Sequence, residues 1–221
     1  MAINDRGHVV GTRAGGEAFL WRDGRTTDLG AFTPTDINNR DEVVGYRFDD
    51  TQAVLWRDGI RTDLGTPGTH RVAHAVNDRT EVVGWSSAGA DGRMRAFSWR
   101  GGVLTLIGDD DSVATDVNDR GQIVGSVGAT DQFAVRWWRG TERLRTEPAQ
   151  AVAVNREGAI AGVHFGSGTA GFVWQRGRFI ERARRDRRSQ PDDRRRLGAT
   201  RGDLATIRPR AGVPPSDLTV A

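Results

Sequence analysis

The sequence contains no cysteine and only one tyrosine. The absence of cysteine excludes a disulfide framework. No apolar run approaches the roughly 18 residues that a membrane helix needs, and we expect no membrane association. The opening residues MAINDRGHVV also lack the basic segment and the run of about 7 to 15 apolar residues that mark an export signal. These absences leave the cell compartment open.

Lysine is missing as well, because all 32 basic residues are arginine. The net charge of +3 arises in residues 182–221, which carry eleven Arg against five Asp, so residues 1–181 are mildly acidic. The basic stretch has no interleaved aromatic side chains, which does not favour nucleic-acid binding. It also has too little apolar surface to form a core. We therefore predict that residues 182–221 form a disordered basic tail.

The rest of the chain is a repeat. Three anchors recur in one frame: an asparagine, a glycine seven residues later, and a tryptophan after a variable stretch. Five copies in register, about 40 residues apart, indicate a repeat architecture. The anchors are Asn4, Asn38, Asn77, Asn118 and Asn155, then Gly11, Gly45, Gly84, Gly125 and Gly162, and then Trp21, Trp56, Trp99, Trp137 and Trp174.

Each copy contains four short stretches rich in Val, Ile, Phe and Trp, bounded by Gly, Asn and Asp, which is typical of β-strands. Residues 1–181 show no convincing helical period. Four antiparallel strands in every copy, with a recurrent tryptophan, are the pattern of a β-propeller blade. We predict an all-β, five-bladed propeller whose four-stranded blades lie at about residues 1–34, 35–70, 71–112, 113–149 and 150–181.

The repeated anchors are interpreted as structural. The motif N-D-R-G and its relatives have the chemistry of a type I turn, with Asp41 and Thr80 in place of the glycine in the second and third copies. A second tight hairpin follows each tryptophan. Each buried tryptophan removes about 150 to 250 Å² from water, so we expect all five indoles to lie in the core.

The stretch EAFLWRDGRTTDLG, from Glu17 to Gly30, is the best example of a wider likeness. Residues 2–181 resemble the extracellular HAF-repeat family, whose motif runs approximately A-x-x-I-N-x-x-G-x-V-V-G and then H-A-F-L-W-x-x-G and x-D-L-G. The family's histidine is replaced by Glu17, Gln52 and Arg95 in the first three copies. The resemblance implies a propeller-type fold and an extracellular protein, and it implies no agreed catalytic residues.

The first strand of the first copy is barely present, as residues 1–4. Because a ring needs its last blade joined to its first, we expect weak or imperfect closure. An unpaired sheet edge at that place would invite self-association. A further hypothesis follows from the same observation: the chain is a truncated fragment without activity, and its tail is the frameshifted remnant of another repeat.

The leading functional hypothesis is a non-catalytic scaffold. The loops between the second and third strands vary in length and content, and such loops on a rigid scaffold collect binding residues. Exposed aromatic side chains beside Arg and Asp there could receive a protein, peptide or glycan, and packing over the blade ends is the alternative. The candidate binding residues are Tyr46, Arg47, Phe48, Trp85, Arg93, Arg95, His164 and Phe165.

An enzymatic alternative uses paired carboxylates at the channel mouth. Asp36 and Asp116 occupy the same repeat position, two residues before the asparagine. If the first strand is innermost, both approach the axis, and glycoside hydrolysis needs two carboxyl groups about 5 to 9.5 Å apart. A glycan-active hydrolase or lyase is therefore the second hypothesis. A solvated residue at the end of a strand is the structural alternative for each aspartate.

The sequence predicts no cofactor. His8, His70, His74 and His164 are too scattered for the spacing of metal ligands. The acidic stretch GDDDS at 108–112 could hold Ca²⁺ through clustered oxygens, but it lacks the Gly and Glu positions of a known calcium loop. A solvated acidic turn is the favoured interpretation.

Overall fold

The computed structural model describes residues 1–65, 68, 70–87, 91–165 and 168–180. All the described strands lie within residues 1–182, which form one compact unit. No helix in the described part of the chain is long and apolar enough to cross a membrane. The predicted disordered tail lies outside the described residues.

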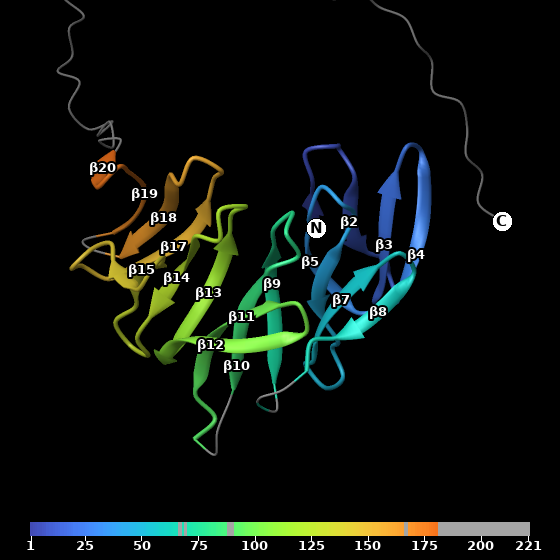
Figure 1. Ribbon diagram of the computed structural model, residues 1–221, viewed down its shortest axis with the longest axis horizontal. Helices are drawn as coiled ribbons and strands as arrows, with labels where there is room; N and C mark the ends of the chain where they lie inside the picture. Colours follow the sequence, from blue (N-terminus) through green and yellow to red (C-terminus); the bar gives the residue numbers. More distant parts are fainter. Residues whose placement is uncertain (66–67, 69, 88–90, 166–167, 181–221) are drawn as a thin grey trace, which may run out of the picture. The chain divides into compact units, whose positions relative to one another are not determined.

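The described chain forms five four-stranded antiparallel sheets, and each strand pairs with its neighbours in sequence (Figure 1). This confirms the predicted all-β fold of five blades. The first two sheets comprise β1 (Ala2–Ile3), β2 (Val9–Thr12), β3 (Glu17–Arg22) and β4 (Arg25–Ala31), and then β5 (Thr33–Ile37), β6 (Val43–Tyr46), β7 (Ala53–Arg57) and β8 (Ile60–Asp63). The third sheet comprises β9 (Arg71–Val76), β10 (Val82–Ser87), β11 (Met94–Arg100) and β12 (Val103–Asp110). The last two comprise β13 (Ser112–Val117), β14 (Ile123–Val127), β15 (Phe133–Trp137) and β16 (Thr141–Arg143), and then β17 (Ala149–Val154), β18 (Ile160–Phe165), β19 (Thr169–Gln175) and β20 (Arg178–Ile180).

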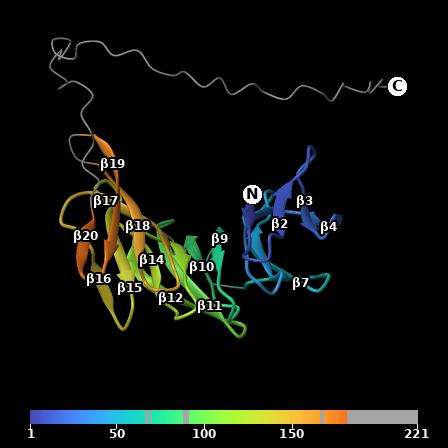
Figure 2. The ribbon, with the colours of Figure 1, turned by 90° about the horizontal axis from the view of Figure 1, so that it is seen from above.

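Consecutive sheets pack face to face, and the core lies between them. One cluster joins Val10 and Leu20 of the first sheet to Ile37, Val43 and Trp56 of the second. Three more clusters of the same kind join the second sheet to the third, the third to the fourth, and the fourth to the fifth. Figure 2 shows β10, β14 and β18, the second strands of the last three sheets, in succession. Stacking therefore buries faces that a single sheet would expose.

The tryptophans do not all share one environment. Trp56, Trp137 and Trp174 are buried, each at 8% exposure or less, and Trp99 is half-buried against the cluster between the second and third sheets. Trp21 differs from the expectation, because 42% of it is exposed. The other four pack toward the preceding sheet, and the described residues place no sheet before the first. The burial of this indole therefore depends on whether another sheet covers it, and not on the sequence of its own repeat.

The glycine seven residues after each asparagine has a steric reason. In the last four sheets the first strand bulges opposite this glycine. A methyl group on Gly84 would overlap the carbonyl oxygen of Val72, and one on Gly45 would overlap that of Thr33. A methyl group on Gly11 would instead first meet a side chain, the ring of Phe19, at 3.0 Å. The bulge itself requires glycine in the facing strand.

We expect Gly84→Ala to destabilise the fold by about 3 kcal/mol or more, because rigid backbone cannot move away from the new methyl group. Gly11→Ala is the matched control, and it should cost at most about 1 kcal/mol, since an aromatic ring can shift. Denaturant unfolding of both variants measures the difference. Equal losses would contradict the steric role assigned to the bulge.

Positive backbone angles recur at the fourth position of each asparagine turn. Glycine occupies it in three copies, but Asp41 and Thr80 adopt φ values of 61° and 59° there. Such strain in a non-glycine residue persists only where surrounding contacts hold it. Asp41 receives hydrogen bonds from His8 and Arg22, and the Thr80 hydroxyl donates to Glu42 of the preceding sheet. Both replacements therefore link neighbouring sheets.

Candidate functional site

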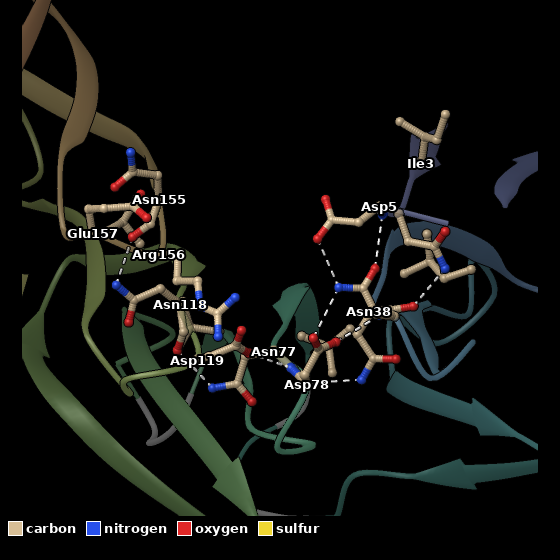
Figure 3. A pocket seen from close by; sticks show the side chains of 16 residues that line it. Ile3, Asp5, Asn38, Asn77, Asp78, Asn118, Asp119, Asn155, Arg156 and Glu157 are labelled. Atoms are coloured by element: carbon tan, nitrogen blue, oxygen red, sulfur yellow. Dashed lines mark hydrogen bonds between the residues drawn. The ribbon is translucent and has the colours of Figure 1, made fainter. Parts of the chain in front are cut away.

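A central cavity of about 490 Å³ lies where the asparagine turns of all five sheets meet. Figure 3 shows Asn38, Asn77, Asn118 and Asn155 along its wall. In each sheet the lining comprises the residue before the asparagine, the asparagine itself and the residue or residues after it. The residues before the asparagines are Ile3, Ile37, Val76, Val117 and Val154. Its wall is predominantly polar, because the turn residues point inward.

Each of the first four turn asparagines performs two tasks with one amide group. The Asn77 side-chain oxygen accepts the backbone N–H groups of Arg79 and Glu81, which closes its own turn. Its nitrogen donates to the backbone carbonyl of Asn118 in the next sheet at 2.9 Å. The same link runs from Asn4 to Asn38, from Asn38 to Asn77 and from Asn118 to Asn155, at 2.9 Å each. The repeated asparagine is therefore the joint between blades.

A second row of hydrogen bonds runs beside the first. The backbone N–H of Asp5 donates to the side chain of Asn39, that of Asn39 to Asp78, and that of Asp78 to Asp119. The Asn39 amide also donates to both Asp5 and Asp78. The polar side chains that the first four sheets place in the cavity wall are thus engaged in joining sheets.

Behind the turns lies a set of buried polar groups that sequence reasoning did not find. Glu42 is fully buried, yet it accepts hydrogen bonds from Asn38 at 2.6 Å and from Thr80 at 2.9 Å. Arg40 and Arg57 approach the same carboxylate at 3.2 and 3.4 Å. A buried carboxylate is tolerated only with such compensation. This group therefore stabilises the contact between the second and third sheets.

The equivalent contact between the first two sheets uses a histidine. The His8 ring nitrogen Nδ1 lies 2.6 Å from the Asp41 carboxylate, and Arg22 reaches the other oxygen at 3.1 Å. Burial alone would raise the pKa of Asp41, but the hydrogen bonds from His8 and Arg22 outweigh burial and lower that pKa. The pair resembles a catalytic dyad in composition, but it is buried between two sheets.

Asp36 and Asp116, the carboxylates of the enzymatic hypothesis, are both half-buried. The Asp36 carboxylate accepts the backbone N–H of Val76 in the next sheet at 2.9 Å, and Asp116 accepts that of Val154 at 2.7 Å. Burial raises the pKa of Asp36 from 3.8 to about 6, with the negative charge of Asp116 adding to it, against the two backbone hydrogen bonds. Burial likewise raises the pKa of Asp116. Each aspartate therefore already serves as a bridge between sheets.

A second cavity, of about 530 Å³, opens among the loops of the first and second sheets. We call it the rim cavity. It is lined by Gly15, Gly16, Ala31, Phe32, Thr33, Arg47, Phe48, Asp49 and Arg61. Phe48 is 86% exposed, while Phe32 is buried at 2%. An aromatic side chain exposed beside a concave apolar surface is a feature of interaction sites.

The charges at this rim are largely paired. Arg47 forms hydrogen bonds with both carboxylate oxygens of Asp50 and lies 3.4 Å from Asp63. Arg61 donates one hydrogen bond, to the carbonyl of Ala31 at 3.2 Å. Asp50 and Asp63 are thus engaged, whereas Arg61 uses one of its five donors within the described part of the chain.

The structure brings some of the predicted binding residues together and separates others. Arg47 and Phe48 line the rim cavity, directly after Tyr46 at the end of β6. Trp85 and Arg95 lie in β10 and β11 of the third sheet, and Arg93 lies in the loop directly before β11. His164 and Phe165 end β18 in the fifth sheet. Phe32 and Arg61 were missed, because only the packing of adjacent blades places them beside Phe48.

The acidic stretch at 108–112 is engaged with arginine. Asp110 lies 2.6 Å from Arg95, and Asp111 lies 2.9 Å from Arg93. Among the described residues, no group of three or more His, Cys, Asp or Glu side chains is arranged to hold a metal ion.

Neither a family model nor a curated protein sequence matches this chain. Solved structures do. TolB from Acinetobacter baumannii is 12% identical with a TM-score of 0.55, and the match covers 79% of this chain and 51% of that one. A protein assigned as a gluconolactonase is 13% identical (TM-score 0.45, 73% and 68% covered), and the calcium-binding protein regucalcin from Agrobacterium tumefaciens is 12% identical (TM-score 0.42, 80% and 77% covered).

The likeness to TolB, at this identity, concerns the fold alone. The chain spans about half the length of that structure. Together with five stacked four-stranded sheets, it places the protein in the class of β-propeller-type folds.

We expect Asn77→Asp to destabilise the protein by about 2 to 4 kcal/mol, because the variant keeps the turn acceptor but loses the donor to Asn118 and sets a carboxylate against Glu81. Asn155→Asp is the matched control, since its side-chain nitrogen has no partner within the described residues, and it should cost under about 1 kcal/mol. Thermal and denaturant unfolding compare the two. Similar losses would show that the turn, and not the link between sheets, carries the effect.

Asp36 gives an expectation for pH dependence. Its folded pKa of about 6 lies above its ordinary value of 3.8, so its contribution to stability is complete below the ordinary pKa and is lost as the pH rises through about 6. Asp36→Asn has no proton to lose. The free energy of unfolding of the wild type, relative to this variant, should therefore fall by up to about 3 kcal/mol between about pH 4 and pH 7.

Denaturant unfolding across that pH range measures the change. Asp131→Asn, at an exposed position, is the control and should leave the pH dependence unchanged. A relative stability that stays constant with pH would contradict the buried environment of Asp36.

Proposed function

We propose that this protein is a non-catalytic binding scaffold that receives a segment of a partner protein or peptide at the rim cavity. The observation that carries this proposal is Phe48, 86% exposed beside a cavity of about 530 Å³ on the variable-loop face. Large aromatic side chains in such positions commonly anchor a binding partner. The cavity lies on the face where the loops differ most between copies.

The chemistry of the cavity favours a peptide over a glycan. Glycan recognition commonly uses several acceptors for hydroxyl groups, but Asp49 is the one carboxylate among the described lining residues and already accepts the backbone N–H of Asp50. The nearby Asp50 and Asp63 are engaged with Arg47. An apolar side chain can pack against the exposed ring of Phe48, and Arg61 can donate to a carbonyl or carboxylate beside it. We therefore propose a ligand segment that presents an aromatic or aliphatic side chain next to an oxygen acceptor.

The enzymatic alternative is supported by one specific observation, the raised pKa of Asp36. A carboxyl group that titrates near pH 6 can act as a general acid. Against this role, Asp36 and Asp116 each accept a backbone hydrogen bond from the following sheet. The scaffold is therefore the favoured proposal.

We also propose that the repeat is of the HAF type. This proposal rests on the stretch EAFLWRDGRTTDLG and its relatives in the other copies.

The experiment pans a random peptide display library against the immobilised full chain and measures the affinity of recovered peptides by calorimetry. We expect Phe48→Ala to weaken binding about tenfold or more, or about 1.4 kcal/mol, because it removes the anchor. Ile60→Ala is the control, since Ile60 is 67% exposed and lies outside the cavity. Melting temperatures of both variants should match the wild type.

A second variant, Trp85→Ala, tests whether the binding surface extends to the third sheet.

Peptides that bind the Phe48→Ala variant as tightly as the wild type would contradict the proposed site. Failure to recover any peptide, with a positive result on a glycan array, would favour the carbohydrate alternative. Failure of both would favour an inactive fragment.

A further inference from the structure

The contacts between sheets have a direction. Each sheet has a trailing face, which packs on the preceding sheet, and a leading face, which packs on the following one. In the second sheet, Val43 and Trp56 belong to the trailing face, while Val44 and Leu55 belong to the leading face. The same division holds in every cluster, so four successive contacts repeat one template.

Two faces have no sheet against them in the described residues. On the trailing face of the first sheet, Ile3 is 66% exposed, whereas Ile37, at the same repeat position in the second sheet, is 4% exposed. On the leading face of the fifth sheet, Val173 is 39% exposed, whereas its equivalent Leu55 is 4% exposed. The exposed Trp21 also lies on the trailing face of the first sheet. Both are apolar surfaces that the fold buries wherever a neighbouring sheet is present.

The hydrogen-bonding groups at the two faces are complementary. The Asn155 side-chain nitrogen has no partner among the described residues, although its four equivalents each donate to the next sheet. Among the described residues, the backbone carbonyl of Asn4 accepts only the N–H of Gly7. The carbonyls of Asn38, Asn77, Asn118 and Asn155 each accept a turn N–H and also the preceding asparagine. The fifth sheet thus presents an unused donor and the first an unused acceptor.

The leading face of the fifth sheet also lacks a polar side chain that the second, third and fourth sheets have at the equivalent position. Thr35, His74 and Thr115 share one repeat position, and their side chains contact a carbonyl of the following sheet. Val152 occupies this position in the fifth sheet and is 51% exposed. Because valine needs no acceptor, this change makes the leading face more apolar. Exposed apolar side chains gathered on one face of a sheet indicate an interface.

We propose that the leading face of the fifth sheet binds the trailing face of the first sheet of a second copy of this chain, repeating the contact between consecutive blades. The first sheet carries the one trailing face left uncovered in the described residues, and its acceptor matches the donor of Asn155. Such a contact uses different surfaces on the two partners, so it builds either a closed ring or an open chain of copies.

The experiment measures sedimentation velocity of the full chain from about 1 to about 200 µM, because association by mass action depends on concentration. We expect dimers or larger species to grow with concentration. Val173→Arg blocks the leading face and Trp21→Arg blocks the trailing face, and each variant alone should remain monomeric. Ile60→Arg, a substitution at an exposed apolar residue outside both faces, should associate as the wild type does.

A mixture of the two blocked variants distinguishes this contact from any symmetric one. Each variant retains one intact face, so the mixture should form a one-to-one dimer and nothing larger. Val152→Arg and Ile3→Arg provide a second pair if either first variant loses the wild-type melting transition. A wild-type chain that stays monomeric over the whole range, or a mixture of blocked variants that does not dimerise, would overturn the proposal.

Discussion

The structure depends on the hydrogen bond that each of the first four turn asparagines donates to the backbone carbonyl of the next one. The acceptor oxygen of the amide closes its own turn, while the nitrogen joins the following sheet, as in Asn77. Aspartate could supply the acceptor but not the donor. The repeat therefore requires asparagine partly because of the hydrogen bond to the next copy. Apolar faces then stack in a fixed order behind this row of bonds.

This arrangement explains where function is expected. The polar side chains at the centre, including Asp78 and Asn39, hold sheets together, and the buried carboxylate of Glu42 does the same one layer behind. Groups engaged in this way are poorly suited to binding a ligand. The loops at the other end of the sheets also make some links between sheets, such as the hydrogen bond from the Arg71 backbone N–H to the Thr51 carbonyl. Phe48, however, stands exposed there beside a cavity.

The terminal sheets show how strongly the packing of each sheet depends on its neighbours. Trp21 and Trp56 occupy the same repeat position, yet one is 42% exposed and the other 8%. Gly11 and Gly84 differ in the same way, because only the latter faces a bulged first strand. In a repeat architecture, stability is a sum of unit and nearest-neighbour terms. The end units lack one such neighbour, and their uncovered faces are the basis for the proposed contact between copies.

The sequence by itself determined the all-β repeat, the four strands of each unit and the tight turns, because spacing, turn residues and β-branched runs are local signals. It also pointed to Phe48 and Arg47 through loop variability. Only the tertiary structure decided that Phe32 and Arg61 share their cavity, that Asp36 and Asp116 bridge sheets, and that Trp21 differs from its equivalents. Each of these depends on which sheet lies against which, and contacts between residues about 40 positions apart leave no local pattern in the chain.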